Sequence, residues 1–206
     1  MILMVVFSVV LAVALYSVMP EKMVTHWGLY GQPDGWMGKF WGLAMFPLIN
    51  TLMLLMFVLV PLIEPKKENI SKFRSDYDRL IVWISMILNY IFILSVFYNL
   101  GIIFDMGRWV MPGIGALYVG IGSVLPRAKQ NYSVGIRTPW TLASDSVWKK
   151  THELGGKLFV VSGLATVLAI FLPVEWGFAV TIGSVILATL AVMFYSWREY
   201  EAELRK

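Results

Sequence analysis

The stretch FWGLAMFPLINTLMLLMFVLVPLI, at residues 40–63, decides the fold because it contains no charged side chain. An α-helix rises about 1.5 Å per residue, so roughly 20 apolar residues cross a hydrocarbon core of about 30 Å. This stretch is long enough to do so. It therefore predicts a transmembrane helix, and the rest of the chain is interpreted around it.

Further apolar stretches lie on both sides of this one, and the 206-residue chain has a mean hydropathy of +0.71. The first has no Lys or Arg ahead of its apolar run, so we expect a retained helix rather than a signal peptide. The pattern predicts an all-α membrane protein, a six-transmembrane-helix bundle. The other predicted spans are residues 1–19, 80–104, 109–125, 155–172 and 176–197.

Basic residues are unevenly distributed between the connections. Of the 17 Lys and Arg residues, 14 lie in the second connection, the fourth connection and the C-terminal tail. Cytoplasmic segments of membrane proteins carry such an excess. The distribution therefore predicts that both termini are cytoplasmic, and it assigns the basic residues to orientation rather than to nucleic-acid binding.

The composition excludes several kinds of site. There is no cysteine, and the two histidines, His26 and His152, lie in separate hydrophilic segments. Thiolate chemistry and a multi-histidine metal centre are therefore not available from one subunit. We expect neither a bound metal nor a cofactor.

The predicted spans contain polar residues but no ionisable group near their centres, which disfavours an ion-coupled transporter. Asn50, Asn89 and Asn99 are expected to make hydrogen bonds between helices. A polar path along Asn89 and Asn99 is the basis of an alternative function, a small-molecule or ion transporter. A stripe of small residues in the fourth span is expected to pack closely against another helix: Ala116, Gly120 and Ser123.

The first loop, residues 20–39, is rich in glycine and aromatic residues, which predicts a compact, turn-rich structure outside the cell. His26 and Asp34 are expected to face each other across it. They would either satisfy the turns of the loop or recognise an outside ligand. A metal site is a weaker alternative, since two ligands are too few.

The fourth loop, residues 126–157, is too long for a simple connector and is expected to be ordered. Ser144 is a plausible N-cap for a short helix to Leu154, which would lie along the inner leaflet before the fifth span. Trp148 and His152 would share one face of this helix.

No complete catalytic motif occurs in this loop. The run from His152 has glycine where the HExxH zinc motif needs its second histidine, and there is no phosphate loop or G-x-S-x-G elbow. An intramembrane enzyme using His152, Glu153 and Arg137 is a second alternative. Neighbouring helical residues point about 100° apart, which makes His152 and Glu153 a poor acid–base pair.

The segments NYSVGIRTPWTL (131–142) and VWKKTHELGGK (147–157) resemble the signature of the SdpI-like family of bacterial and archaeal membrane proteins. The segment THWGLYGQPDGWMGK (25–39) resembles an uncharacterised domain that often precedes that signature. The resemblance divides the chain into a two-helix unit, residues 1–65, and an SdpI-like unit, residues 66–206.

The family is named for immunity to a secreted sporulation-delaying peptide toxin. The resemblance therefore implies a prokaryotic cell-membrane protein that counters or senses such a peptide outside and recruits a winged-helix repressor inside. The lipid bilayer is the remaining expected partner. The candidate residues outside are His26, Trp27, Gly31, Asp34 and Lys39, and those inside are Asn131, Gly135, Arg137, Thr138, Trp140, Thr141, Trp148, His152 and Glu153, with Gly155 and Gly156 completing the signature.

Overall fold

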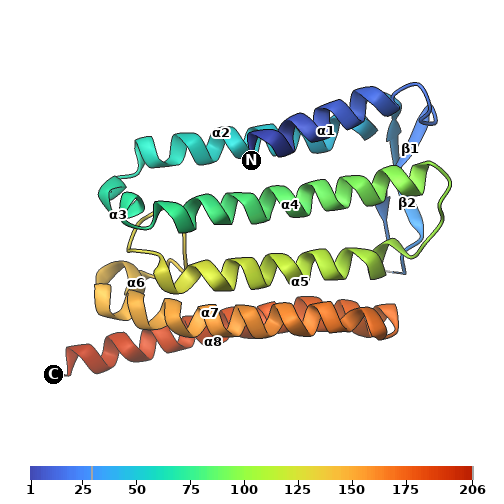
Figure 1. The fold of residues 1–206 in the computed structure, drawn as a ribbon. Coiled ribbons are helices and arrows are strands. Elements are labelled where there is room, and N and C mark those ends of the chain that lie inside the picture. The colour runs from blue at the N-terminus through green and yellow to red at the C-terminus, as the bar shows by residue number, and fades with distance from the viewer. Residues whose placement is uncertain (29, 206) are drawn as a thin grey trace.

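Long helices lie side by side as a bundle in the computed structural model, which describes residues 1–28 and 30–205 (Figure 1). Their bounds are Ile2–Leu15 (α1), Lys39–Ile63 (α2), Arg74–Asn99 (α4), Met106–Val124 (α5), Asp145–Leu168 (α7) and Val174–Leu204 (α8). The shorter elements are β1 (Lys22–Trp27), β2 (Pro33–Gly38), α3 (Lys67–Lys72), α6 (Pro139–Ala143) and the 3-10 turns Leu125–Arg127 and Ala169–Phe171.

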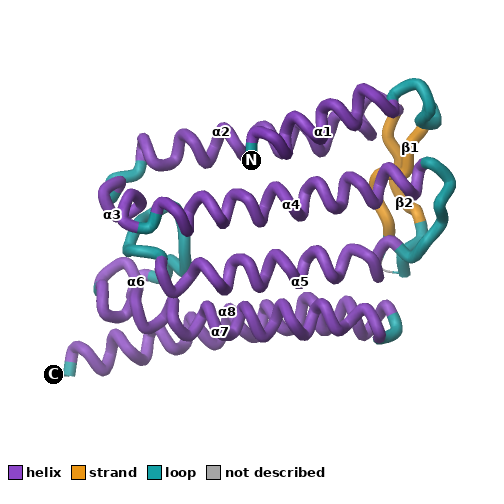
Figure 2. Tube along the Cα trace, in the orientation of Figure 1, coloured by secondary structure: helices purple, strands orange, loops and turns teal. Residues whose placement is uncertain are grey.

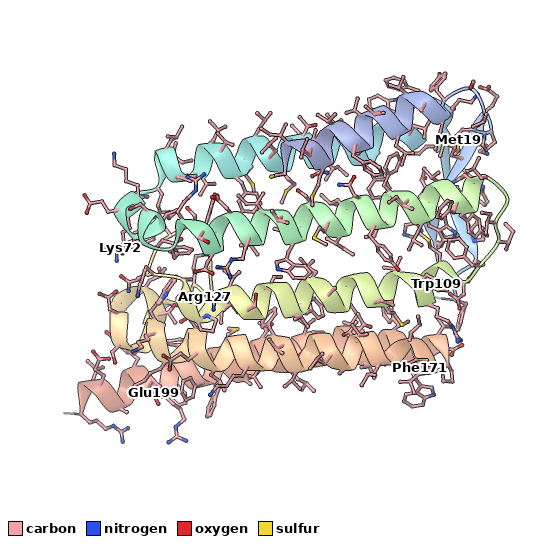
Figure 3. The ribbon with its side chains drawn as sticks, viewed as in Figure 1. Met19, Lys72, Trp109, Arg127, Phe171 and Glu199 are labelled. Atoms are coloured by element: carbon pink, nitrogen blue, oxygen red, sulfur yellow. The ribbon has the colours of Figure 1, made fainter. Side chains whose placement is uncertain are left out.

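The two ends of the bundle differ in character. The strands lie at one end, which we call the hairpin end, and α3, α6 and the C-terminus lie at the other, the signature end (Figure 2). Figure 3 shows Lys72 and Arg127 at the signature end and Trp109 and Phe171 at the hairpin end. Apolar side chains cover the surface between the ends, with Leu3 82% and Leu187 68% exposed. Such a surface is suited to lipid rather than water.

Within the described residues, five helices are long and apolar enough to cross a membrane: α2, α4, α5, α7 and α8. This confirms a predominantly helical, multi-pass membrane protein. α1 has only 14 residues, fewer than the roughly 20 that a span needs. Figure 1 accordingly shows the N-terminus partway along the bundle.

The expectation of an all-α fold is wrong in the first loop, where β1 and β2 form an antiparallel hairpin. Asn99, at the end of α4, behaves as a further strand partner: its Oδ1 accepts from the N–H of Val24 at 2.7 Å and its Nδ2 donates to the Val24 carbonyl at 2.9 Å. The hairpin is therefore fixed to the helical bundle. Glycine at 31 permits the turn, because its φ of 74° is strained for other residues.

Glycines allow α5 and α7 to approach closely. A Cβ on Gly115 would lie 2.6 Å from the Gly163 carbonyl oxygen, and one on Gly122 would lie 2.6 Å from that of Gly156. The predicted stripe also meets a helix, since a Cβ on Gly120 would collide with the Trp83 ring of α4. The α5–α7 glycines, however, are a separate contact that the prediction lacked.

Two tyrosines of α4 hydrogen-bond to the backbone near prolines that lie inside α2 and α5. Pro61 has no N–H, so the carbonyl of Phe57 one turn earlier lacks its helical partner. The Tyr77 hydroxyl donates to that carbonyl at 2.8 Å. Close to Pro112 in α5, the Tyr90 hydroxyl likewise donates to the Trp109 carbonyl at 2.6 Å. These bonds hold α2 and α5 against α4.

The expectation of a separate short helix in the fourth loop also needs correction. The short helix from Ser144 to Leu154 is instead the first part of the continuous helix α7, because Gly155 and Gly156 serve close packing and do not end the helix. The N-cap is confirmed, since the Ser144 side chain accepts from the N–H of Val147.

The asparagines do not all act as predicted. The long-range bonds of Asn99 go to strand β1 and not to another helix. Among the described residues, Asn89 donates to Ser85 of its own helix, at 2.8 Å. The side chain of Asn50 is buried and has no hydrogen-bond partner among the described residues. The prediction of hydrogen bonds between helices is therefore wrong for all three asparagines, although Asn99 does join its helix to the hairpin.

Candidate functional site

His26 and Asp34 meet across the hairpin, as predicted from the sequence. The distance from His26 Nδ1 to Asp34 Oδ1 is 2.5 Å, and the two side chains are 74% and 46% exposed. Gly35 pairs with His26 in the sheet, and a Cβ on it would lie 2.8 Å from that of His26. Glycine at this position therefore lets the imidazole lie over the second strand.

Trp27 joins the hairpin to the helical bundle. Its ring packs edge-on against Tyr98 of α4, with ring centres 5.3 Å apart. Its indole nitrogen is buried and has no hydrogen-bond partner among the described residues. Leaving a buried N–H without an acceptor costs free energy, so this indole is an unsatisfied polar group where the hairpin meets α4.

A cavity of about 580 Å³ lies beneath the hairpin. Its roof contains His26, Trp27 and Asp34, so three of the predicted recognition residues share one site. Its walls come from four helices and are almost entirely apolar. They include Phe46 of α2, Ile91 of α4, Val110 and Ile114 of α5, and Phe178 and Ile182 of α8.

The other two predicted recognition residues do not line this cavity. Gly31 is buried in the hairpin turn, where a Cβ would lie 2.6 Å from Asp105 Oδ1. Lys39 pairs with Glu21 at 2.7 Å and lies over the ring of Tyr16, with Nζ 5.3 Å from its centre. Both residues therefore hold the hairpin in place.

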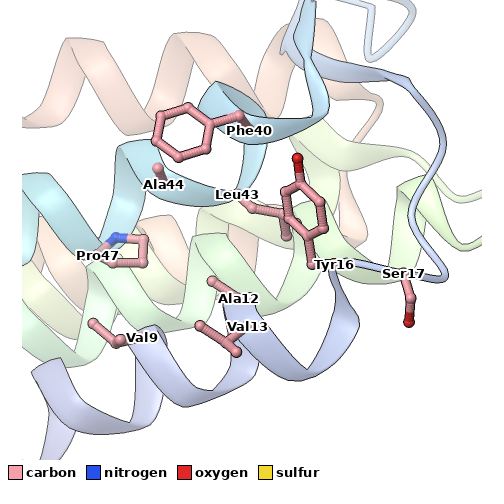
Figure 4. Close-up of a pocket in the computed structure, with 9 residues that line it drawn as sticks. All are labelled: Val9, Ala12, Val13, Tyr16, Ser17, Phe40, Leu43, Ala44 and Pro47. Carbon is pink, nitrogen blue, oxygen red and sulfur yellow. The ribbon is translucent and has the colours of Figure 1, made fainter.

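A second apolar groove, of about 590 Å³, lies between α1 and α2 (Figure 4). Its lining includes Val9, Ala12, Ala44 and Pro47, with Tyr16 and Ser17 where α1 ends. It is similar in size to the cavity beneath the hairpin but has no charged residue in its lining. The two apolar sites thus differ in polarity.

At the signature end, His152 is fully buried and both ring nitrogens are occupied. Nε2 accepts from the N–H of Ile136 at 2.9 Å, so Nδ1 carries the proton and donates to the Trp148 carbonyl at 2.8 Å. The Trp148 ring stacks on the imidazole at 4.0 Å, which confirms their shared face. Gly135, with φ of 123°, lets the loop approach, since a Cβ there would be 2.5 Å from Nε2.

Three more signature residues are buried parts of the same scaffold. Asn131 accepts from the N–H groups of Ser133 and Val134 and donates to the carbonyls of Lys129 and Val134. Thr138 and Thr141 form a capping box at the start of α6. Thr138 also reaches α8, with its Oγ1 3.1 Å from the Ser196 hydroxyl oxygen. These contacts order the loop.

Glu64 was missed in the sequence analysis, although it joins α2 to the signature loop. Its carboxylate is buried and accepts hydrogen bonds from the Ser133 hydroxyl and from the N–H groups of Lys66 and Tyr132. Burial acts to raise the pKa of Glu64, but these hydrogen bonds and the positive charge of Arg137 outweigh it and lower the pKa. An acid directly after an apolar span was the available signal.

Gln130 makes a second connection between the same segments. The side-chain oxygen of Gln130 accepts a hydrogen bond from Lys66 Nζ, and its backbone carbonyl accepts from Asn69 Nδ2 at 2.8 Å. Its Nε2 donates to the Thr141 carbonyl at 2.8 Å. Like Glu64, it was not predicted. Both residues link the segment after α2 to the loop after α5.

The remaining predicted residues of the loop are more accessible. Arg137 is exposed and donates to the Tyr132 carbonyl, while Trp140 is half-buried. Glu153 is exposed on α7, whereas His152 beside it is enclosed. The geometry therefore gives no support to acid–base chemistry by the His152 and Glu153 pair. Arg137 and Glu153 are therefore among the signature residues that a partner can reach.

Comparison with known proteins confirms the resemblance seen in the sequence. Residues 127–196 match the SdpI/YfhL protein family, and residues 3–51 match a domain of unknown function, DUF1648. The chain is 26% identical over 200 residues to the immunity protein SdpI of Bacillus subtilis (strain 168), covering 97% of this chain and 94% of that protein. No solved structure matches.

Proposed function

Starting from this likeness to an immunity protein, we propose that the chain is a membrane immunity protein and receptor for a membrane-active peptide. The hairpin end faces outward and the signature end faces the cytoplasm. The 14-residue α1 is the sixth span of this proposal, which makes the N-terminus cytoplasmic. The distribution of Lys and Arg supports this orientation.

The observation that carries the proposal is the cavity beneath the hairpin. Ligand sites are usually concave and mostly apolar, with a few polar groups that orient the ligand. This cavity has that character, with His26, Trp27 and Asp34 in its roof and apolar side chains below. A peptide that acts on membranes is itself apolar over part of its length, so it matches both the lining and the location.

The signature end supports the second half of the proposal, recruitment of a cytoplasmic repressor. The loop is held rigid by buried contacts, and it leaves Tyr132 and Arg137 exposed on its surface. The guanidinium group has donors beyond the one that binds the Tyr132 carbonyl. A rigid loop with an accessible arginine is suited to docking a protein partner with acidic groups.

The test is a survival assay. The chain is expressed in a bacterial strain that lacks an immunity protein of its own, and the cells are challenged with the purified sporulation-delaying peptide. We expect survival to rise at least about tenfold over cells carrying an empty vector. Equal survival at confirmed membrane abundance would contradict the proposed immunity.

A further inference from the structure

We propose that a pocket at the signature end binds the headgroup of phosphatidylglycerol, an anionic phospholipid whose headgroup carries free hydroxyl groups. The pocket has a volume of about 340 Å³ and lies beside α3, between the end of α2 and the start of α4 (Figure 2). Its lining consists of Pro61, Lys67, Glu68, Ile70, Ser71 and Arg74. The site is separate from the cavity beneath the hairpin and does not depend on the proposed function.

Two basic side chains in the lining have hydrogen-bond donors to spare. The Lys67 ammonium group makes no hydrogen bond or ion pair among the described residues. Arg74 donates from Nε to Asp78 at 2.8 Å, and its guanidinium lies over the ring of Tyr77 at 5.7 Å. These contacts hold the arginine in place and leave the donors on its two terminal nitrogens. Arginine and lysine are the side chains with which proteins bind phosphate.

The pocket adjoins the apolar surface of the bundle. Pro61 lies in the last turn of α2, and the next two residues, Leu62 and Ile63, are 71% and 77% exposed. The chain then turns polar, and α3 begins at Lys67. A phospholipid presents the same order of surfaces, an apolar chain followed by a phosphate group. Basic pockets at this depth bind acidic lipid headgroups in membrane proteins, whereas a soluble phosphate compound makes no use of the apolar side chains.

Glu68 favours one kind of headgroup over another. Its carboxylate also lines the pocket and forms no ion pair with Lys67 or Arg74. The lining therefore has an excess of positive charge together with a free acceptor. In phosphatidylglycerol the phosphate matches the two cations, and the glycerol hydroxyls can donate to Glu68. Phosphatidylcholine has no such donor, and its own positive charge would lie close to Lys67 and Arg74.

Other basic residues at the signature end are already engaged by the protein. Three of them bind side chains of the chain itself: Lys66 to Gln130, Arg127 to Asp76, and Lys150 to Glu199. Lys67 differs from these residues because its charge has no partner among the residues that the structure describes. An anion from outside the chain is therefore the available counter-charge in this pocket.

Native mass spectrometry of the detergent-purified chain tests the proposal. The protein is titrated with phosphatidylglycerol or phosphatidylcholine, and soluble glycerol 3-phosphate is added as a competitor. We expect the first phosphatidylglycerol to bind at least about tenfold more tightly than the first phosphatidylcholine, the effect of one hydrogen bond to a charged group. Equal binding of the two lipids would overturn the proposal. Displacement of the lipid by glycerol 3-phosphate would show instead a site for soluble phosphate compounds.

Charge variants separate this pocket from the general positive charge of the signature end. The double variant Lys67→Gln and Arg74→Gln should weaken phosphatidylglycerol binding at least about tenfold. The matched control is Lys149→Gln with Arg198→Gln, which removes one lysine and one arginine from exposed positions outside the pocket. The control should bind phosphatidylglycerol as the wild type does. Equal loss in both double variants would show that overall charge determines binding and would contradict the assigned site.

A bulky substitution tests the pocket without changing its charge. Ser71→Trp fills the pocket and should weaken phosphatidylglycerol binding as much as loss of the two cations does. Ser75→Trp, at an exposed position of α4 outside the lining, is its control and should bind normally. Normal binding by Ser71→Trp would place the lipid elsewhere. The melting temperature is recorded for every variant, and Ser71→Leu replaces Ser71→Trp if the larger side chain prevents folding.

Discussion

The Ser133 hydroxyl donates a hydrogen bond to Glu64, a residue 69 positions earlier in the chain. Glu64 directly follows α2, and the same helix contributes Phe46 to the cavity at the hairpin end. One continuous helix therefore runs from the proposed peptide site to the signature loop. A displacement of α2 at one end must be accommodated by the contacts of Glu64 at the other.

Replacing Glu64 should loosen this connection. Glu64→Gln removes the charge that faces Arg137 and places an amide where Ser133 and two backbone groups donate. Hydrogen bonds to charged groups contribute about 1.5–3 kcal/mol each, so we expect a lower melting temperature in detergent. Glu68→Gln on exposed α3 is the control and should melt as the wild type does. Equal melting of both variants would show that the junction contributes little.

The same carboxylate predicts a pH dependence. The pKa of Glu64 is lower in the folded protein than its ordinary value of 4.5. The stabilisation is therefore fully present above about pH 4.5 and is lost as the pH falls through the folded-state pKa. Melting curves from pH 6 to pH 3 should show the wild type approaching Glu64→Gln at the acid end. A constant difference between the two proteins across this range would contradict the assignment.

Glycine at the α5–α7 contact should be irreplaceable. A Cβ on Gly163 would lie 2.5 Å from the Gly115 carbonyl oxygen, so Gly163→Ala should separate the helices and cost about 1–3 kcal/mol. Gly183 of α8 has no atom within 4 Å of the equivalent position, which makes Gly183→Ala a matched control. We expect the control to melt at or above the wild-type temperature. Similar effects at both sites would show that helix propensity dominates.

Substitutions of His152 and Arg137 should distinguish a structural role in the signature loop from a role in docking a partner. His152→Ala leaves the N–H of Ile136 without its acceptor and should lower the amount of folded protein in the membrane. Arg137→Ala should leave abundance unchanged and abolish recruitment of the repressor, measured by co-purification from membranes. Lys149→Ala, exposed on α7, is the control for both. Normal abundance of His152→Ala would contradict the scaffold role.

Orientation can be tested directly because the chain has no cysteine of its own. A cysteine at Gln32, exposed on the hairpin, should react with an impermeant thiol reagent in intact cells. A cysteine at Ser71, exposed on α3 at the signature end, should react only after the cells are broken. The reverse pattern would invert the proposed orientation.

The sequence predicted the features that depend on local composition. The long apolar helices follow from their length, and the shared helix face of Trp148 and His152 follows from their spacing. The hairpin was not predicted, because its glycines also fit irregular turns and its attachment depends on Asn99, 75 positions from Val24. The role of Glu64 likewise depends on a contact between distant segments. Periodicity within a segment carries no information about such partners.

The junction at Glu64 also bears on how such chains evolve. The N-terminal unit contributes the acid, and the signature unit contributes the hydroxyl and backbone groups that surround it. We therefore expect the two units to be inherited as a matched pair. A recombinant that takes residues 1–65 from a relative retains a stable junction only if that relative also supplies a carboxylate where α2 ends.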